Sequence, residues 1–570
     1  MTKSGKQSVA KIVVDSLARH GVEVMFSQSL PSAVLLAAED RNIEQFMYRT
    51  ENAGAVMADG YARISGKVGV VSAQNGPAAT LLVPGLAEAL KVSVPIVALV
   101  QDVVRAQADR NAFQEFDHIT LFKSCTKLVR RVTEASRIVD YIDMAFANAA
   151  SGRPGPVVLI LPADLLLEEI TVPELRKSNL GYFPLDRAVA DPDRIEEAVE
   201  LLASANNPLL LAGGGVHLSA ASEAVAALQR DAHIPVMTTV MGKGVVDERH
   251  PLSIGVTGYA MGKLSPTRYM RPIIQQADVI LLVGTRTNQN GTDSWALYPE
   301  HARYIHIDVD GAEIGRNYEA LRLVGDARLT LETIYKQLKG RRGPATEIEL
   351  RIADAKQKHA TDIAALEQSN DTPIRPERMA ADIRQVLTSE MIVVADASYA
   401  TLWVACYLPS LKIGMRFITP RGLAGLGWGL PLAIGAKAAC PDSPVLCMVG
   451  DGGFAHVWAE LETAARRKTP VVLTVLNNSC LGYQKDAEDV KFGRHSTACY
   501  FTAVDHAAIA RASGCRGVRI EKASEYLPAL REALTCDETT VLDVITDPTA
   551  YPPVTFFDGL DDIRKSKADN

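Results

Sequence analysis

The sequence predicts an α/β protein with three doubly wound domains, each built on a parallel sheet. At 570 residues the chain is too long for one hydrophobic core. Short apolar and β-branched runs alternate with segments of amphipathic helical spacing, which is the pattern of parallel sheets covered by helices. We expect domains at residues 1–185, 186–345 and 372–550, followed by a tail at 551–570.

The predicted strands are short apolar runs that end at glycine, proline or polar residues. In the first domain they lie at 21–26, 68–72, 94–100 and 156–162. In the second domain they lie at 208–215, 235–239, 279–284 and 305–310. Charged residues dominate 339–371, which predicts an exposed linker with a surface helix. The polar tail predicts a mobile lid or disorder.

Composition narrows the class of partner. The formal net charge of −7 argues against nucleic acid. No apolar run approaches the length of a membrane span and no signal peptide is evident at the N-terminus, so we expect no membrane partner and a cytoplasmic protein. The cysteines show no metal-ligand spacing and are interpreted as free thiols.

A β-α-β pattern in the third domain gives the strongest chemical signal. Gly450, Asp451 and Gly452 follow one buried strand, and Asn478 follows the next strand 27 positions after Asp451. Because parallel neighbouring strands end at one edge of a sheet, these two loops should converge. A carboxylate and an amide oxygen suit Mg²⁺, and glycines let backbone N–H groups approach a diphosphate.

This spacing resembles the thiamine diphosphate motif of the decarboxylase and acetohydroxyacid synthase superfamily, and the resemblance covers residues 7–550. It implies pyrimidine-binding, central and diphosphate-binding domains. It also implies that Mg²⁺ is held by Asp451, Asn478 and the backbone carbonyl of Cys480. The further cofactor contacts that it implies in this domain are Gly450, Gly452, Gly453, Cys480, Leu481, Gly482 and Tyr483.

The first domain matches the superfamily at three places. Glu51 begins a helix, where a carboxylate could simply favour the helix dipole by about 0.3–1 kcal/mol; the resemblance implies that it contacts the aminopyrimidine N1′. Gly76 and Pro77 form a turn that the resemblance places over the aminopyrimidine and the substrate. Gln114 lies in a run similar to one in the synthases, which makes it a candidate substrate contact; the alternative is a solvated polar residue.

The run from Arg421 to Pro431 matches the synthases, with Leu426 where they carry methionine. The resemblance implies that Leu426 wedges between the two rings of the cofactor and that Ala424 also contacts it. The alternative for Leu426 is an ordinary core residue.

Several positions depart from the synthases. Asn290 replaces the arginine that meets their second substrate, and Ala487 stands at their specificity tryptophan. Tyr399 and Ala400 replace a glutamine and a histidine. Glu488 is a candidate catalytic acid or base, or else part of a solvated charge run.

The resemblance implies an acetolactate synthase-like decarboxylase and carboligase, a transferase or lyase that acts on a small 2-oxo acid such as pyruvate. The alternative is a 2-hydroxyacyl-CoA lyase or oxalyl-CoA decarboxylase-like enzyme acting on an acyl-CoA or aldehyde; a catalytically silent partner subunit is the alternative from another class. The central domain would hold FAD, an ADP-containing ligand, or neither. Because the cofactor residues lie on different domains, and the partner subunit completes the site in this superfamily, a homodimer or homotetramer is implied.

Overall fold

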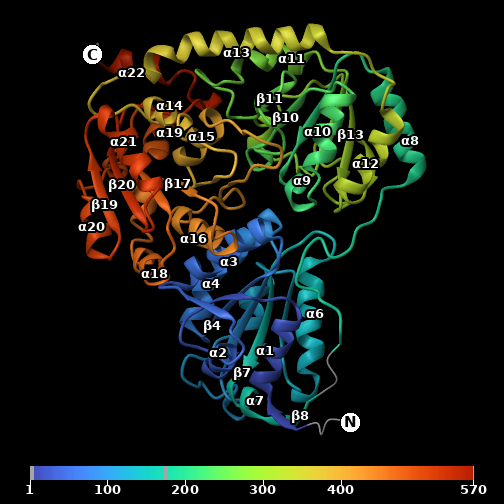
Figure 1. Cartoon of the computed structure of the whole chain (residues 1–570), viewed down its shortest axis with the longest axis vertical. Helices are drawn as coiled ribbons and strands as arrows, with labels where there is room; N and C mark the ends of the chain where they lie inside the picture. The colour runs from blue at the N-terminus through green and yellow to red at the C-terminus, as the bar shows by residue number, and fades with distance from the viewer. Residues whose placement is uncertain (1–4, 173–175, 569–570) are drawn as a thin grey trace.

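A computed structural model gives the structure of residues 5–172 and 176–568. It confirms the predicted fold class, because it contains three six-stranded sheets whose strands are all parallel. In Figure 1 the first sheet lies at the bottom in blue, the second at the upper right in green, and the third at the upper left in orange and red.

In each sheet the order of the strands differs from their order along the chain. The first sheet runs β3 (Glu44–Met47), β2 (Val24–Ser27), β4 (Gly69–Ala73), β5 (Ile96–Asp102), β7 (Val157–Pro162), β6 (Leu128–Arg131). The second runs β11 (Ser253–Val256), β10 (Val236–Thr238), β9 (Pro208–Ala212), β12 (Val279–Val283), β13 (Arg303–Asp308), β14 (Ala320–Val324). The third runs β16 (Phe417–Ile418), β15 (Ile392–Ala395), β17 (Val445–Gly450), β18 (Val472–Asn477), β20 (Thr540–Ile545), β19 (Arg516–Ile520).

Two helices join the first and third sheets into one core. Helix α3 (Glu51–Ser65) is capped at its N-terminus by Thr50, whose side chain accepts a hydrogen bond from the N–H of Ala53. It packs against α16 (Gly429–Ala439), and Figure 1 shows the pair between the two sheets. The contact is at backbone distance, because a Cβ at Gly435 would lie 2.0 Å from the carbonyl oxygen of Met57. Buried residues of both sheets therefore form one continuous hydrophobic cluster.

The segment after β20 forms helices, so disorder, one of the two alternatives predicted for 551–570, is wrong for residues 551–568; the mobile lid stays a prediction. The segment forms η7 (Thr555–Phe557) and α22 (Leu560–Ala568). The Phe557 ring is fully buried, and Arg564 and Asp561 make ion pairs with Asp486 and Lys263. A buried aromatic anchor and these ion pairs provide contacts that the polar composition did not reveal.

Two other expectations, the surface helix and the free thiols, are confirmed. The charged stretch at 339–371 contains α13 (Thr346–Glu367), a long surface helix that runs along the top of Figure 1. All eight cysteines are free thiols. Within residues 5–172 and 176–568, no helix is long and apolar enough to cross a membrane.

Candidate active site

The loops that follow β17 and β18 meet at one cavity of about 270 Å³. Asp451 and Asn478 both line it, so the predicted convergence of the two loops is confirmed. The other sequence-predicted residues that line this cavity are Leu426, Gly450, Gly452, Gly453, Cys480, Leu481, Gly482 and Tyr483.

Asp451 ties the two loops together. Its carboxylate accepts the N–H of Gly452 at 2.8 Å and the N–H of Ser479 at 2.6 Å. Burial raises the pKa of Asp451 to about 6, so this carboxylate is costly to ionise without a cation beside it. The Asn478 side-chain oxygen accepts the N–H of Cys480 at 3.1 Å, which fixes its position next to Asp451.

Two helices begin at the rim of this cavity. Helix α15 (Tyr399–Tyr407) starts after Ser398, and α19 (Gly482–Phe492) starts after Leu481; neither start is capped by a side chain. Uncapped helix N-termini present backbone N–H groups and a positive dipole end to an anion. The buried Thr546 hydroxyl also lines the cavity and has no hydrogen-bond partner among the described residues.

These donors fit a diphosphate with a divalent cation. Among the described residues, no cluster of three or more His, Cys, Asp or Glu side chains could hold a metal. One carboxylate, one amide and one backbone carbonyl make an oxygen-donor set that leaves room for water and phosphate oxygens, which is the ligation Mg²⁺ prefers.

A buried chain of polar groups surrounds Tyr399, which the resemblance marked as a departure from the synthases. The Tyr399 hydroxyl donates to Asp486 at 2.5 Å. Arg564 donates to the other oxygen of Asp486 at 2.6 Å, and Asp486 is fully buried. Sequence reasoning missed this role of Arg564, because no local signal links it to a residue 78 positions away.

The first domain contributes a second group of predicted residues. Glu51 is 6% exposed at the start of α3, and burial raises the pKa of its carboxyl group. Gly76 has a φ of 64°, and a Cβ there would lie 2.7 Å from the carbonyl oxygen of Gln114, so only glycine fits. The Gln114 side chain accepts a hydrogen bond from Gln74 at 2.6 Å. The turn at Gly76 and Pro77 therefore packs on the Gln114 loop.

These first-domain residues do not line the Asp451 cavity within one chain. The predicted site residues thus fall into two groups, which we call the Glu51 half-site and the Asp451 half-site. Ala424 does not line the cavity either; it has a φ of 59° and lies two positions before Leu426, which does.

Glu488 lies on α19 outside the residues that line the cavity. Its carboxylate accepts hydrogen bonds from the Gln484 side chain at 2.9 Å and from the N–H of Ser496 at 2.7 Å. These bonds, the Gln484 contact first, hold the pKa of Glu488 below its usual range. Its catalytic role stays a prediction.

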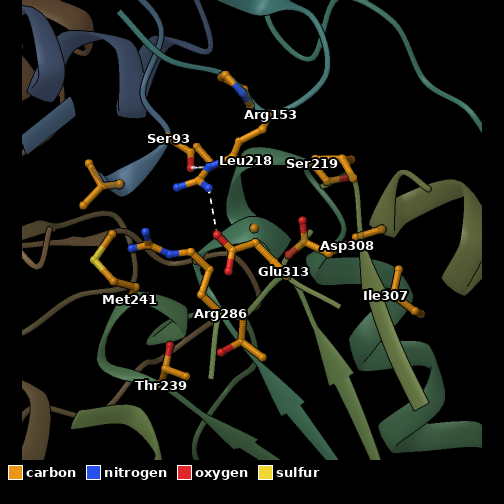
Figure 2. A pocket seen from close by; sticks show the side chains of 18 of the residues that line it. Ser93, Arg153, Leu218, Ser219, Thr239, Met241, Arg286, Ile307, Asp308 and Glu313 are labelled. Atoms are coloured by element: carbon orange, nitrogen blue, oxygen red, sulfur yellow. Dashed lines mark hydrogen bonds and ion pairs between the residues drawn. The ribbon is translucent and has the colours of Figure 1, made fainter. Parts of the chain in front are cut away.

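A larger cavity of about 410 Å³ lies between the first and second sheets (Figure 2). Figure 2 shows Arg153 reaching toward Glu313, with which it pairs at 2.9 Å. Burial, reinforced by the charge of Arg153, lowers the pKa of Arg286, and burial raises the pKa of Asp308 at the end of β13 to about 6. The glycine-rich turn after β9 also lines this cavity, and so does Asn290.

The family models match all three sheet-bearing regions. Residues 7–121 match the N-terminal thiamine pyrophosphate (thiamine diphosphate) binding domain of thiamine pyrophosphate enzymes, residues 195–334 match the central domain, and residues 396–544 match the C-terminal binding domain. The chain belongs to the thiamine pyrophosphate enzyme family, and it is an enzyme that depends on thiamine diphosphate.

Within this family the chain is similar to acetolactate synthase large subunits along its whole length. A probable large subunit from Methanococcus aeolicus is 34% identical over 95% of this chain and 92% of the relative. One from Methanocaldococcus jannaschii is 33% identical over 96% and 93%. The isozyme 3 large subunit from Escherichia coli is 30% identical over 99% of each chain.

Proposed function

We propose that the protein is a Mg²⁺-dependent acetolactate synthase-like decarboxylase and carboligase that acts on a small 2-oxo acid such as pyruvate. The observation that carries this proposal is the cavity at which Asp451, Asn478 and two uncapped helix N-termini converge. The full-length similarity to acetolactate synthase large subunits supports the reaction type.

The third domain binds the charged end of the cofactor. Asp451, Asn478 and the Cys480 carbonyl would hold the metal ion, whose positive charge would offset the charge that burial makes costly on Asp451. The diphosphate is held by backbone groups of Gly450, Gly452, Gly453, Leu481, Gly482 and Tyr483. We assign this diphosphate-binding domain to residues 372–550.

The first domain, at residues 1–185, binds the aminopyrimidine end. The raised pKa of Glu51 favours its protonated form, which can donate a hydrogen bond to the ring nitrogen N1′. Gly76 and Pro77 would contact the aminopyrimidine end and Gln114 the substrate, while Ala424 and Leu426 of the third domain would contact the cofactor. When bound, thiamine diphosphate supplies the electron sink for breaking the bond beside the substrate carbonyl.

A second copy of the chain completes the site. The Glu51 and Asp451 half-sites lie on different domains and do not share a cavity within one chain. The first domain of one subunit therefore faces the third domain of its partner, and the protein is a homodimer or a dimer of dimers.

The second candidate function is a 2-hydroxyacyl-CoA lyase or an oxalyl-CoA decarboxylase-like enzyme. Asn290 and Ala487 favour it, because each stands where the synthases carry a side chain that contacts substrate. The central domain at 186–345 would then hold an ADP-containing ligand in the 410 Å³ cavity instead of FAD. The presence of Glu51, Asp451 and Asn478 argues against a catalytically silent subunit.

The test is a product assay on the purified protein with thiamine diphosphate and Mg²⁺, joined to a mass-spectrometric inventory of bound nucleotide. Release of CO₂ from pyruvate together with acetolactate is expected. Chelation of the metal should abolish both products, and Asp451→Asn should raise the Mg²⁺ concentration required. Turnover of thioesters alone, on protein that binds the cofactor, would establish the second candidate instead.

A further inference from the structure

A buried carboxylate of the first domain holds a backbone loop of the third domain. Glu88 lies on α4 (Pro77–Val92) and is 2% exposed. Its carboxylate accepts the N–H groups of Gly422 at 2.7 Å, Leu423 at 2.5 Å and Ala424 at 3.3 Å. A Cβ at Gly422 would lie 2.9 Å from a Glu88 oxygen, so glycine lets the loop approach this closely.

A buried carboxylate of the third domain likewise holds a backbone segment of the first domain. Glu460 begins α18 (Glu460–Arg466) of the third domain and is 1% exposed. Its carboxylate accepts the N–H groups of Arg49 and Thr50 at 3.0 Å each, and the Thr463 hydroxyl at 2.8 Å. Arg49 and Thr50 immediately precede Glu51, and Thr50 is the N-cap of α3.

Each carboxylate therefore fixes a segment that carries a residue assigned to the cofactor. On the far side of the Glu88 loop, Asp396 accepts the N–H groups of Gly427, Trp428 and Gly429 at 2.9, 3.0 and 3.2 Å. Leu426 lies between these two anchored ends. Buried carboxylates and buried N–H groups are both costly when unpaired, so each contact resists displacement of the backbone.

We propose that Glu88 and Glu460 are positioning residues that act as reciprocal clamps between the first and third domains, Glu88 on the loop that carries Leu426 and Glu460 on the segment that carries Glu51. The effect on cofactor binding rests on the proposed function, because that function assigns Leu426 and Glu51 to the cofactor. The clamping itself rests only on the hydrogen bonds.

Hydrogen exchange on the cofactor-free protein tests the clamps directly. Glu88→Gln keeps the size of the side chain but replaces one acceptor by a donor, which opposes the loop N–H groups. We expect amide exchange at 421–426 to rise about tenfold or more, as for loss of a charge-assisted hydrogen bond, with no change at 47–54. Glu460→Gln should give the reverse pattern, so each variant is the control for the other.

A third variant separates clamping from general loosening of the interface. Glu462→Gln removes a carboxylate that accepts a hydrogen bond from the Arg49 side chain at 2.8 Å, whereas the backbone N–H groups of Arg49 and Thr50 both donate to Glu460. It should leave exchange of the Arg49 and Thr50 amides and of the 421–426 loop unchanged, because Glu460 and Glu88 still accept those N–H groups. Faster exchange in both segments for every variant, or in neither segment for any, would overturn the proposal. Should Glu88→Gln fail to fold, Glu88→Asp keeps the charge while shortening its reach.

Titration of each variant with thiamine diphosphate then tests whether the clamps affect cofactor binding. Each clamp variant should weaken thiamine diphosphate binding about tenfold and lower kcat more than it changes KM for the 2-oxo acid, whereas Glu462→Gln should do neither. Unchanged cofactor affinity in both clamp variants would overturn the positioning role. A wild-type protein that binds no thiamine diphosphate would contradict the proposed function, while the exchange pattern would still decide the clamps.

Discussion

Glu51 combines a buried carboxyl group with a raised pKa at the start of a helix. If its proton is shared with the cofactor ring, Glu51→Gln should leave thiamine diphosphate bound but lower turnover by about 10²–10⁴, the range of general acid–base effects. Turnover and a binding titration measure the two quantities separately. Glu23→Gln is the control, because that side chain is 69% exposed in the same domain. Turnover within twofold of wild type would remove Glu51 from the mechanism.

His306 makes stability depend on pH. Burial lowers its pKa from 6.5 to about 4, and its ring nitrogen contacts the Thr285 carbonyl oxygen at 2.9 Å. Because the folded-state pKa is depressed, the unfolded chain binds the proton first. The stabilisation that His306 contributes is therefore complete above pH 6.5 and is lost as the pH falls from 6.5 to about 4.

His306→Gln keeps a donor for Thr285 and removes this titration. Relative to wild type, the slope of unfolding free energy against pH in that window should fall by up to about 1.4 kcal/mol per pH unit. Urea unfolding at several pH values measures it, and the exposed His301→Gln is the control. Burial raises the pKa of Asp308 to about 6, so Asp308 contributes a slope of opposite sign to both proteins. This contribution cancels when the slope of the variant is subtracted from that of the wild type. Equal slopes would contradict the assignment.

At the scale of elements, the crossing of α3 and α16 depends on glycine. Alanine usually stabilises a helix interior over glycine by about 1 kcal/mol. At Gly435, however, the added Cβ would lie 2.0 Å from the Met57 carbonyl oxygen, so the backbones must separate. We expect Gly435→Ala to destabilise the protein by about 1–3 kcal/mol, as overpacked cores do.

Denaturant unfolding measures this difference. Gly343→Ala is the matched control, since nothing lies within 4 Å of a Cβ at that position. A Gly435→Ala protein as stable as wild type would show that the helix contact can shift without cost.

The sequence predicts the central strands well and the edge strands poorly. β5, β7, β17 and β18 are almost entirely buried, so they appear as apolar runs. β3 and β6 are edge strands with the sequences EQFM and LVRR. Because some of their positions are exposed and polar, they do not form apolar runs. Polarity misled the prediction for the C-terminal segment, where ion pairs and one buried ring order the chain.

The same limit applies to the site. Asp451 and Asn478 were predictable to meet, because a β-α-β connection between neighbouring strands fixes their relation locally. The contact between Glu88 and Leu423 joins residues 335 positions apart, and no spacing rule links them. Nor does any local pattern show that Glu51 would not line the Asp451 cavity within one chain, because this depends on how the domains pack.

At the scale of the whole molecule, the separate half-sites predict complementation between inactive chains. In a dimer that mixes Glu51→Gln and Asp451→Asn chains, one centre carries both changes and the other carries neither. Random reassortment of equal amounts should restore about a quarter of the wild-type centres, because half of the dimers are mixed. Activity after co-refolding or co-expression measures this.

A mixture of two changes in the same half-site is the control. Asp451→Asn with Asn478→Ala should restore nothing, since every dimer then lacks an intact diphosphate site in both centres. Equal recovery from both mixtures would contradict a centre shared between subunits.

The core shared by the first and third sheets also constrains how such proteins can change over evolutionary time. Side chains from Val24 to Ile160 and from Ile392 to Val541 belong to one buried cluster, although the second sheet separates them in the chain. Recombination that exchanged only one of these two regions would pair a first sheet and a third sheet from different proteins. Their packing surfaces would not have evolved together, and the helix contact at Gly435 would be broken. Most of the second sheet packs in clusters of its own, so the central segment is the unit that gene exchange can replace with the least disturbance.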